Sequence, residues 1–96
     1  MLIEQKQDGH KGSFYIEKNG SVLAEMTFSM AGTKLMIIDH TEVTDELRGQ
    51  HIGDQLVKTA VEYARTNDIK ILPLCTFAKS VFDKNKTEFG DVLRTD

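Results

Sequence analysis

The 96-residue sequence has one cysteine, one proline and no apolar run that approaches the roughly 18 residues of a membrane-spanning helix. A single cysteine excludes an internal disulfide, and such a chain fits a reducing compartment. Residues 1–9 lack the basic segment and the apolar stretch of a secretion leader. The sequence therefore predicts a cytoplasmic protein that is not associated with membranes.

Basic charge is also scarce, with twelve Lys and Arg residues against fifteen Asp and Glu residues and a net charge of −3. The lysines are isolated and form no stripe interleaved with aromatic residues, so a nucleic-acid partner is not expected. His10, His40 and His51 lack metal-ligand spacing and a cysteine companion, which argues against a metal site. With 40% hydrophobic and 28% charged residues, the composition is that of one globular domain spanning residues 1–96.

The first half of the chain has the pattern of an antiparallel meander. Strands are expected at residues 2–7, 13–18, 21–30 and 35–43. Asn19 and Gly20 form the dipeptide best suited to a two-residue hairpin turn, because both residues tolerate positive φ. In the third strand, the residues that alternate toward one face are Val22, Ala24, Met26 and Phe28, and they are expected to face the core.

From Ile52 onward the apolar residues recur every three or four positions, which predicts an amphipathic helix over residues 52–67. Its apolar positions are Ile52, Leu56, Ala60, Val61 and Ala64. A fifth strand follows at 69–75, and then a helix at 77–85 that is capped by Thr76. In the tail, the expected core contacts are Phe89, Val92 and Leu93. The order implies parallel pairing of the fourth and fifth strands through a right-handed crossover. The predicted fold class is α+β: an antiparallel meander followed by a βαβ unit, giving a mixed central sheet with helices packed on it.

Gly49 and Gly53 lie in the turn between the fourth strand and the long helix. A glycine-containing turn that leads into a helix can present successive backbone N–H groups to an anion, which the helix dipole also favours. Arg48 and His51 add cationic groups. This pattern is compatible with a phosphate site, and the alternative is that the glycines only turn the chain into the helix. Neither a GxxxxGK[ST] nor a GxGxxG motif is present, which disfavours nucleoside triphosphates and dinucleotides.

The stretch RGQHIG, residues 48–53, resembles the [Q/R]xxGx[G/A] signature of the Gcn5-related N-acetyltransferases, and the surrounding residues 39–64 with ILPLC at 71–75 are similar to the small branch of that superfamily. The resemblance implies that the loop amides bind the pyrophosphate of acetyl-CoA and that the fourth strand hydrogen-bonds the pantetheine. The cofactor-binding residues that it implies are Thr41, Val43, Arg48, Gly49, Gln50, His51, Ile52, Gly53 and Asp54. His51 replaces the middle glycine of the signature, which carries a modest penalty if that position needs positive φ.

Glu42 is the candidate base that takes a proton from the amine acceptor, with His40 and Asp39 as alternatives. Strand alternation places His40 and Glu42 on one face, and Asp39 and Thr41 on the other. Members of the superfamily commonly place a tyrosine after the fifth strand to protonate the departing CoA sulfur. This chain has no tyrosine after Tyr63.

Pro73 and Cys75 lie two residues apart at the end of the fifth strand. Pro73 cannot donate a hydrogen bond to a strand ladder, which is compatible with a gap between the fourth and fifth strands. The resemblance implies that pantetheine enters such a gap. A helix N-terminus next to Cys75 lowers the pKa of a thiol. Cys75 is therefore the candidate that takes the acetyl group as a thioester or protonates the CoA sulfur, and the alternative is an inert core cysteine.

The expected function is acetyl-CoA-dependent transfer of an acetyl group to a small-molecule or protein amine. The alternative from another class is a non-catalytic module with the same fold that binds CoA or a protein partner. Cys75 and Glu42 are the residues on which the catalytic expectation rests.

Overall fold

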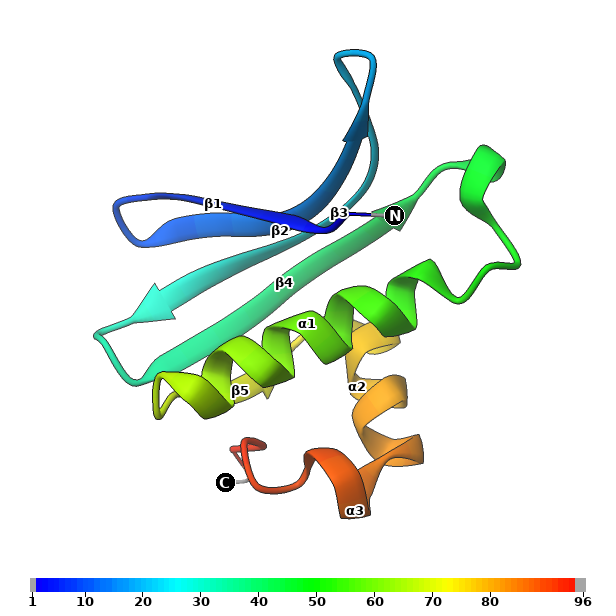
Figure 1. Cartoon of the computed structure of the whole chain (residues 1–96). Helices are drawn as coiled ribbons and strands as arrows, with labels where there is room; N and C mark the ends of the chain where they lie inside the picture. Colours follow the sequence, from blue (N-terminus) through cyan, green and yellow to red (C-terminus); the bar gives the residue numbers. More distant parts are fainter. Residues whose placement is uncertain (1, 95–96) are drawn as a thin grey trace.

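The computed structural model describes residues 2–94, in which five strands form one sheet with the order β1-β2-β3-β4-β5 (Figure 1). The strands are β1 (Glu4–Asp8), β2 (Lys11–Lys18), β3 (Ser21–Ala31), β4 (Leu35–Val43) and β5 (Lys70–Pro73). The helices are a short 3-10 helix, η1 (Asp45–Leu47), and α1 (Ile52–Thr66), α2 (Thr76–Lys84) and α3 (Lys86–Phe89). β1 to β4 pair antiparallel, and β4 pairs parallel with β5. The predicted α+β arrangement, a meander followed by a βαβ unit, is confirmed.

The hairpin between β2 and β3 turns at Asn19 and Gly20, as the sequence predicts. Their φ angles are 53° and 80°, and Lys18 pairs with Ser21 across the turn. Asparagine and glycine tolerate this left-handed backbone better than other residues. The turn therefore fixes the pairing at the tip of the β2–β3 hairpin.

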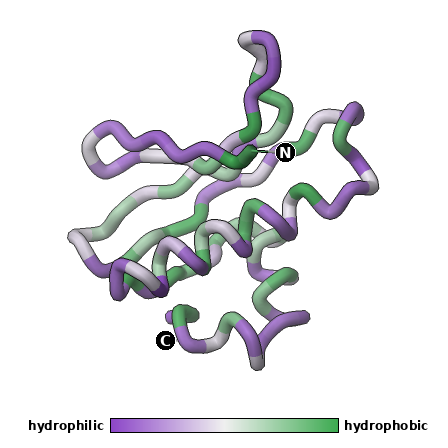
Figure 2. The backbone as a smooth tube through the Cα atoms, viewed as in Figure 1, coloured by the Kyte–Doolittle hydropathy of each residue, from purple (hydrophilic) through white to green (hydrophobic). Residues whose placement is uncertain are grey.

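The hydrophobic core lies between one face of the sheet and α1. The sheet contributes Phe14, Ile16, Ala24, Met26, Phe28, Met36 and Ile38. The helix contributes Ile52, Leu56, Val57, Ala60, Val61 and Ala64, which include every apolar position predicted from the helical spacing. Figure 2 shows apolar and polar stretches alternating along this helix.

Val22 departs from the predicted core face of β3, because its side chain is 41% exposed. The register between β2 and β3 shifts between Ile16 and Glu17, and Val22 pairs with Glu17 beyond that shift. In Figure 1 the tip of this hairpin rises away from α1. The start of β3 is therefore exposed, whereas its middle is in the core.

The tail packs against the outer edge of β5. Phe89 and Val92 are buried, as predicted, and the Ile71 N–H donates to the Val92 carbonyl at 2.6 Å. Arg65 of α1 donates two hydrogen bonds of 2.8 Å to the carboxylate of Asp91. These contacts join the tail to both β5 and α1.

The second half of the chain differs from prediction at the junction of β5 and α2. β5 ends at Pro73 instead of continuing to Cys75, and α2 already begins at Thr76. Cys75, with φ −66° and ψ 127°, is the N-cap residue in place of Thr76. Proline has no N–H with which to extend the strand ladder, so the strand stops there. The thiol consequently lies directly at the start of a helix.

Candidate functional site

β4 and β5 separate beyond the pair Ile38 and Pro73, where their parallel register ends. The N–H groups of Leu74 and Cys75 both donate to the Ile38 carbonyl, at 3.0 and 3.1 Å, and the chain then enters α2. β4 continues to Val43. Among the described residues, no strand pairs with the β5-facing edge of β4 beyond Ile38. The gap expected from Pro73 is thus present in the fold.

The backbone groups of Thr41 and Val43 point into this gap. The Thr44 N–H donates to the Leu23 carbonyl at 2.9 Å, so Thr44 directs its N–H toward β3. The hydrogen-bonding direction alternates along an antiparallel strand, and Glu42 therefore also faces β3. Thr41 and Val43 face the other way, toward the edge that β5 has left. An extended ligand on this edge would pair with them as an added strand does.

The loop between β4 and α1 contains two residues with left-handed backbone, Gly49 with φ 81° and His51 with φ 57°. His51 therefore occupies a position that needs positive φ. It is the N-cap residue of α1 but forms no side-chain capping hydrogen bond. The first N–H groups of a helix have no acceptor within the helix, and the helix dipole adds partial positive charge at this end. The start of α1 is suited to an anion.

A groove of about 470 Å³ connects the edge of β4 with this loop and with the starts of α1 and α2. It is lined by Thr41, Val43, Leu47, Arg48, Gly49, His51, Ile52, Gly53, Asp54, Phe77 and Lys84. Every residue that the resemblance implied for cofactor binding lies on this groove except Gln50. The backbone carbonyl of Gln50 accepts a hydrogen bond from the Gln55 side chain at 3.3 Å.

Sequence reasoning missed three residues that line this groove, Leu47, Phe77 and Lys84. Lys84 brings a third basic side chain to the groove, in addition to Arg48 and His51. Phe77 and Lys84 belong to α2, which is distant from the loop in sequence and contacts α1 in space. The only local signal for Lys84 was a basic residue in the last turn of a helix.

Cys75 lies beside Thr41 at the point where β4 and β5 separate, and its Sγ is 3.6 Å from Thr41 Oγ1. The thiol lies near the first N–H groups of α2 but does not cap the helix with a regular hydrogen bond. Partial burial raises the pKa of Cys75. The Ala78 N–H, the Thr41 hydroxyl and the Phe77 N–H lower the pKa by more, so the net pKa lies below the 9.0 of an ordinary thiol. The fraction of nucleophilic thiolate near neutral pH is therefore increased.

Glu42 lies on the opposite face of the sheet from Cys75. Thr41, which contacts Cys75, pairs with the core residue Met26, whereas Glu42 pairs with Glu25 on the polar face. Glu42 Oε1 is 3.6 Å from His40 Nε2. The structure therefore brings Glu42 next to His40, as alternation predicts, but separates both from Cys75 by the thickness of β4.

Asp39 does not share the face of Thr41, and that prediction is wrong. The register of β3 and β4 shifts between Thr27 and Phe28, which leaves Asp39 without a paired residue. Its carboxylate accepts a hydrogen bond from Ser29 Oγ at 2.7 Å, and Ser29 neighbours Phe28, whose side chain is in the core. A bulge of one residue turns the side chain to the polar face.

Known proteins resemble this chain in sequence and in fold. A sequence profile of the GCN5-related N-acetyl-transferases matches residues 13–92. The chain belongs to this family. Protein NATD1 of Danio rerio is 28% identical to this GCN5-related chain over 84 residues, which cover 86% of the chain and 76% of that protein.

Solved structures share the fold of this GCN5-related chain. A GCN5-like protein from Staphylococcus aureus is 39% identical and has a TM-score of 0.70, with 97% of this chain and 89% of that chain covered. The aminoglycoside N-acetyltransferase AAC(6')-Iy in complex with CoA is 14% identical and has a TM-score of 0.55, with coverage of 91% and 73%. The second likeness is one of fold alone.

Two other features are absent from residues 2–94. No helix in that range is long and apolar enough to span a bilayer. The same residues contain no group of three or more His, Cys, Asp or Glu side chains placed to hold a metal ion.

Proposed function

We propose that this GCN5-related protein binds acetyl-CoA in the 470 Å³ groove and transfers the acetyl group to an amine. One observation carries the proposal: the unpaired edge of β4 and the anion-suited start of α1 open into the same groove. Pantetheine is an extended chain with amide groups, and the pyrophosphate follows it in the same molecule. A ligand of this kind needs a strand edge and a phosphate site in line. The CoA complex of AAC(6')-Iy, a protein with the same fold, supports the choice of ligand.

The residues of the groove fit such a ligand. Thr41 and Val43 offer backbone groups for the pantetheine. At Gly49, no atom lies within 4 Å of the position that a Cβ would take, so the backbone of the loop is open to close approach. Arg48 and Lys84 supply positive charge for phosphate oxygens.

Acetyl-CoA supplies an activated carbonyl carbon bonded to sulfur. The Cys75 thiolate can form a bond to this carbon and release the CoA sulfur with the electron pair of the old C–S bond. The amine nitrogen then forms the amide bond and returns the electron pair to Cys75 Sγ. In the direct alternative, the neutral Cys75 thiol donates its proton to the departing sulfur while the amine attacks, and Cys75 recovers a proton from solvent. One acetyl group is transferred and one proton is released from the ammonium in either route.

The acceptor must lose a proton before its nitrogen can attack. Glu42 lies on the polar face at the end of β4, and its carboxylate is the proposed acceptor of that proton. His40, 3.6 Å from this carboxylate, orients it. An amine would reach the Cys75 side of β4 around the edge that β5 has left.

The proposal is tested by thermal unfolding of the protein with CoA, acetyl-CoA and ATP. A ligand at a hundred times its Kd stabilises the folded state by about 2.7 kcal/mol, and each kcal/mol moves Tm by roughly 4 to 8 °C in a domain of this size. We expect both CoA species to raise Tm and ATP to change it little. An unchanged Tm with both CoA species at millimolar concentration contradicts the proposal.

A non-catalytic CoA-binding module is the second candidate, and the lack of a tyrosine after Tyr63 favours it. The two candidates differ in one readout. If CoA raises Tm but no amine is acetylated by the protein, the non-catalytic module is correct.

A further inference from the structure

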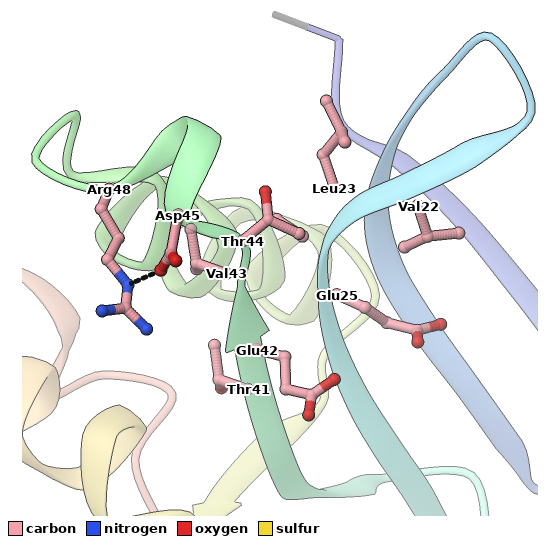
Figure 3. A pocket seen from close by; sticks show the side chains of 10 residues that line it. Val22, Leu23, Glu25, Thr41, Glu42, Val43, Thr44, Asp45 and Arg48 are labelled. Carbon is pink, nitrogen blue, oxygen red and sulfur yellow. Dashed lines mark ion pairs between the residues drawn. The ribbon is translucent and has the colours of Figure 1, made fainter.

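A second groove, of about 680 Å³, adjoins the first at the end of β4 (Figure 3). It is lined by Val22, Leu23, Ala24, Glu25, Thr41, Glu42, Val43, Thr44, Asp45 and Arg48. Thr41, Val43 and Arg48 line both grooves. A molecule in the second groove therefore reaches the same edge of β4 that the first groove offers to acetyl-CoA.

Two carboxylates stand directly opposite each other in this groove. Glu25 of β3 pairs with Glu42 of β4 in the antiparallel register, and Figure 3 shows both side chains on the same side of the two strands. Like charges in this position repel. Their basic neighbours are both 3.6 Å away, Lys6 at Glu25 and His40 at Glu42. A cation between the two carboxylates would relieve their mutual repulsion.

The remaining charge of the groove does not neutralise this pair. Arg48 is the one guanidinium in the lining, and its Nε lies 3.0 Å from Asp45 Oδ1. Val22 and Leu23 of β3 contribute aliphatic surface, and Val22 is 41% exposed, whereas Val43 pairs with the core residue Ala24 and lies on the other face of β4. The groove thus combines an aliphatic wall with two paired carboxylates, which is the complement of a hydrocarbon chain that carries ammonium groups.

We propose that this second groove is the acceptor site for small aliphatic di- and polyamines, an inference that rests on the proposed acetyl transfer. One ammonium group lies between Glu25 and Glu42. The methylene chain lies on the aliphatic wall, and the other nitrogen reaches Thr41 at the edge of β4. That nitrogen forms a bond to the acetyl carbon as the C–S bond of acetyl-CoA breaks. The electron pair of the C–S bond goes to sulfur, and one proton leaves the amine.

The first test measures binding by NMR titration of the full chain with 1,4-diaminobutane, both alone and with CoA present. We expect shifts of the amide resonances of Glu25, Glu42 and Thr44. Two matched ligands separate the charges: butylamine lacks the second ammonium, and 4-aminobutyrate replaces it with a carboxylate. Butylamine should bind more weakly than the diamine, because it has no second nitrogen to reach Thr41. 4-Aminobutyrate should bind more weakly still.

The second test uses Glu25→Gln, because Glu25 is outside the proposed proton-transfer machinery. This substitution should weaken binding of 1,4-diaminobutane and of butylamine about fivefold each, because the single ammonium group of butylamine also lies between Glu25 and Glu42. In the acetyl-transfer assay the KM for the diamine should rise with kcat unchanged. Glu17→Gln is the matched control, since Glu17 is exposed on β2 and does not line the groove.

The outcomes separate this inference from the proposed function. Three results would overturn the inference. The first is equal affinity for the three ligands, and the second is that no amide resonance of the groove shifts at about 10 mM diamine. The third is acetylation of lysine-bearing peptides in preference to diamines. In each of those cases a Tm increase with CoA preserves the proposed CoA site. Diamine binding in a protein that does not bind CoA would retain the cation site and overturn the transfer.

Discussion

Gly53 lies directly against the ring of Phe77. A Cβ added at Gly53 would meet the end of that ring, and Cε2 would be 2.6 Å away, which is closer than any normal carbon contact. Gly53 has an ordinary helical backbone, so φ does not require glycine at this position. The last glycine of the signature is thus explained by the packing of α1 against α2, whether or not a ligand is bound.

Gly53→Ala should destabilise the fold by about 1 to 3 kcal/mol, because an added methyl group forces the Phe77 ring to move. Thermal unfolding measures this as a loss of roughly 4 to 8 °C per kcal/mol. The same substitution in a Phe77→Ala background should cost much less, because the obstacle is gone. An equal loss of Tm in both backgrounds would show that the ring is not what requires the glycine.

His51→Gly should stabilise the protein by about 1 kcal/mol, since glycine adopts the left-handed backbone of φ 57° without the Cβ clash. His51→Ala is the control, because alanine also loses the imidazole but keeps the Cβ. We expect a rise in Tm for glycine alone and CoA affinity equal to or tighter than that of the original protein. A rise for both variants would assign the effect to the side chain.

Cys75 should be alkylated by iodoacetamide with a pH midpoint below 9.0, because its pKa is lowered in the fold. Thr41→Val removes the hydroxyl that stabilises the thiolate and should move the midpoint upward, whereas Thr41→Ser should restore it. A midpoint unaffected by Thr41→Val would contradict this role of the hydroxyl. Mass spectrometry after incubation with acetyl-CoA should show one acetyl adduct, which Cys75→Ala abolishes, if the covalent route operates.

The lowered pKa of Cys75 also predicts how stability depends on pH. The thiolate is favoured in the folded state over the unfolded state, so its contribution is complete above the unfolded pKa near 9.0 and is lost as the pH falls through the lower folded pKa. Cys75→Ala should therefore lose more stability relative to the original protein at about pH 10, one unit above the unfolded pKa, than at about pH 6.5. Denaturant unfolding at the two pH values measures the difference.

Lys84→Met should lower the affinity for CoA about threefold to fivefold, because the lysine supplies one exposed cation to a groove that would hold phosphate groups. Lys79→Met is the matched control on the same helix, since Lys79 does not line the groove. The difference in CoA affinity between the two variants should shrink in about 0.5 M salt, because the Debye length there is shorter than the roughly 10 Å found at 0.1 M. Calorimetric titration with CoA measures all four conditions, and equal affinities of the two variants at low salt would exclude Lys84 from the site.

Local patterns in the sequence predicted much of this fold because they depend on neighbouring residues. Asn19 and Gly20 have the backbone freedom that a two-residue turn requires, and the spacing from Ile52 to Ala64 can bury one stripe only as a helix. Pro73 predicted a gap between the fourth and fifth strands, since the missing N–H is a property of that residue alone, but the strand itself was expected to continue to Cys75 and ends at Pro73. The resemblance around Arg48 to Gly53 led to the family.

Only the tertiary structure decided which distant residues share the site. The packing of α2 on α1 brings Phe77 and Lys84 to the groove, and the sequence around either residue carries no trace of that contact. The bulge at Asp39 changes the face of one side chain because a single inserted residue breaks a period of two. Glu25 and Glu42 meet across β3 and β4 for a similar reason: strand register is set by the cooperative burial of the whole core face, and no short segment contains that information.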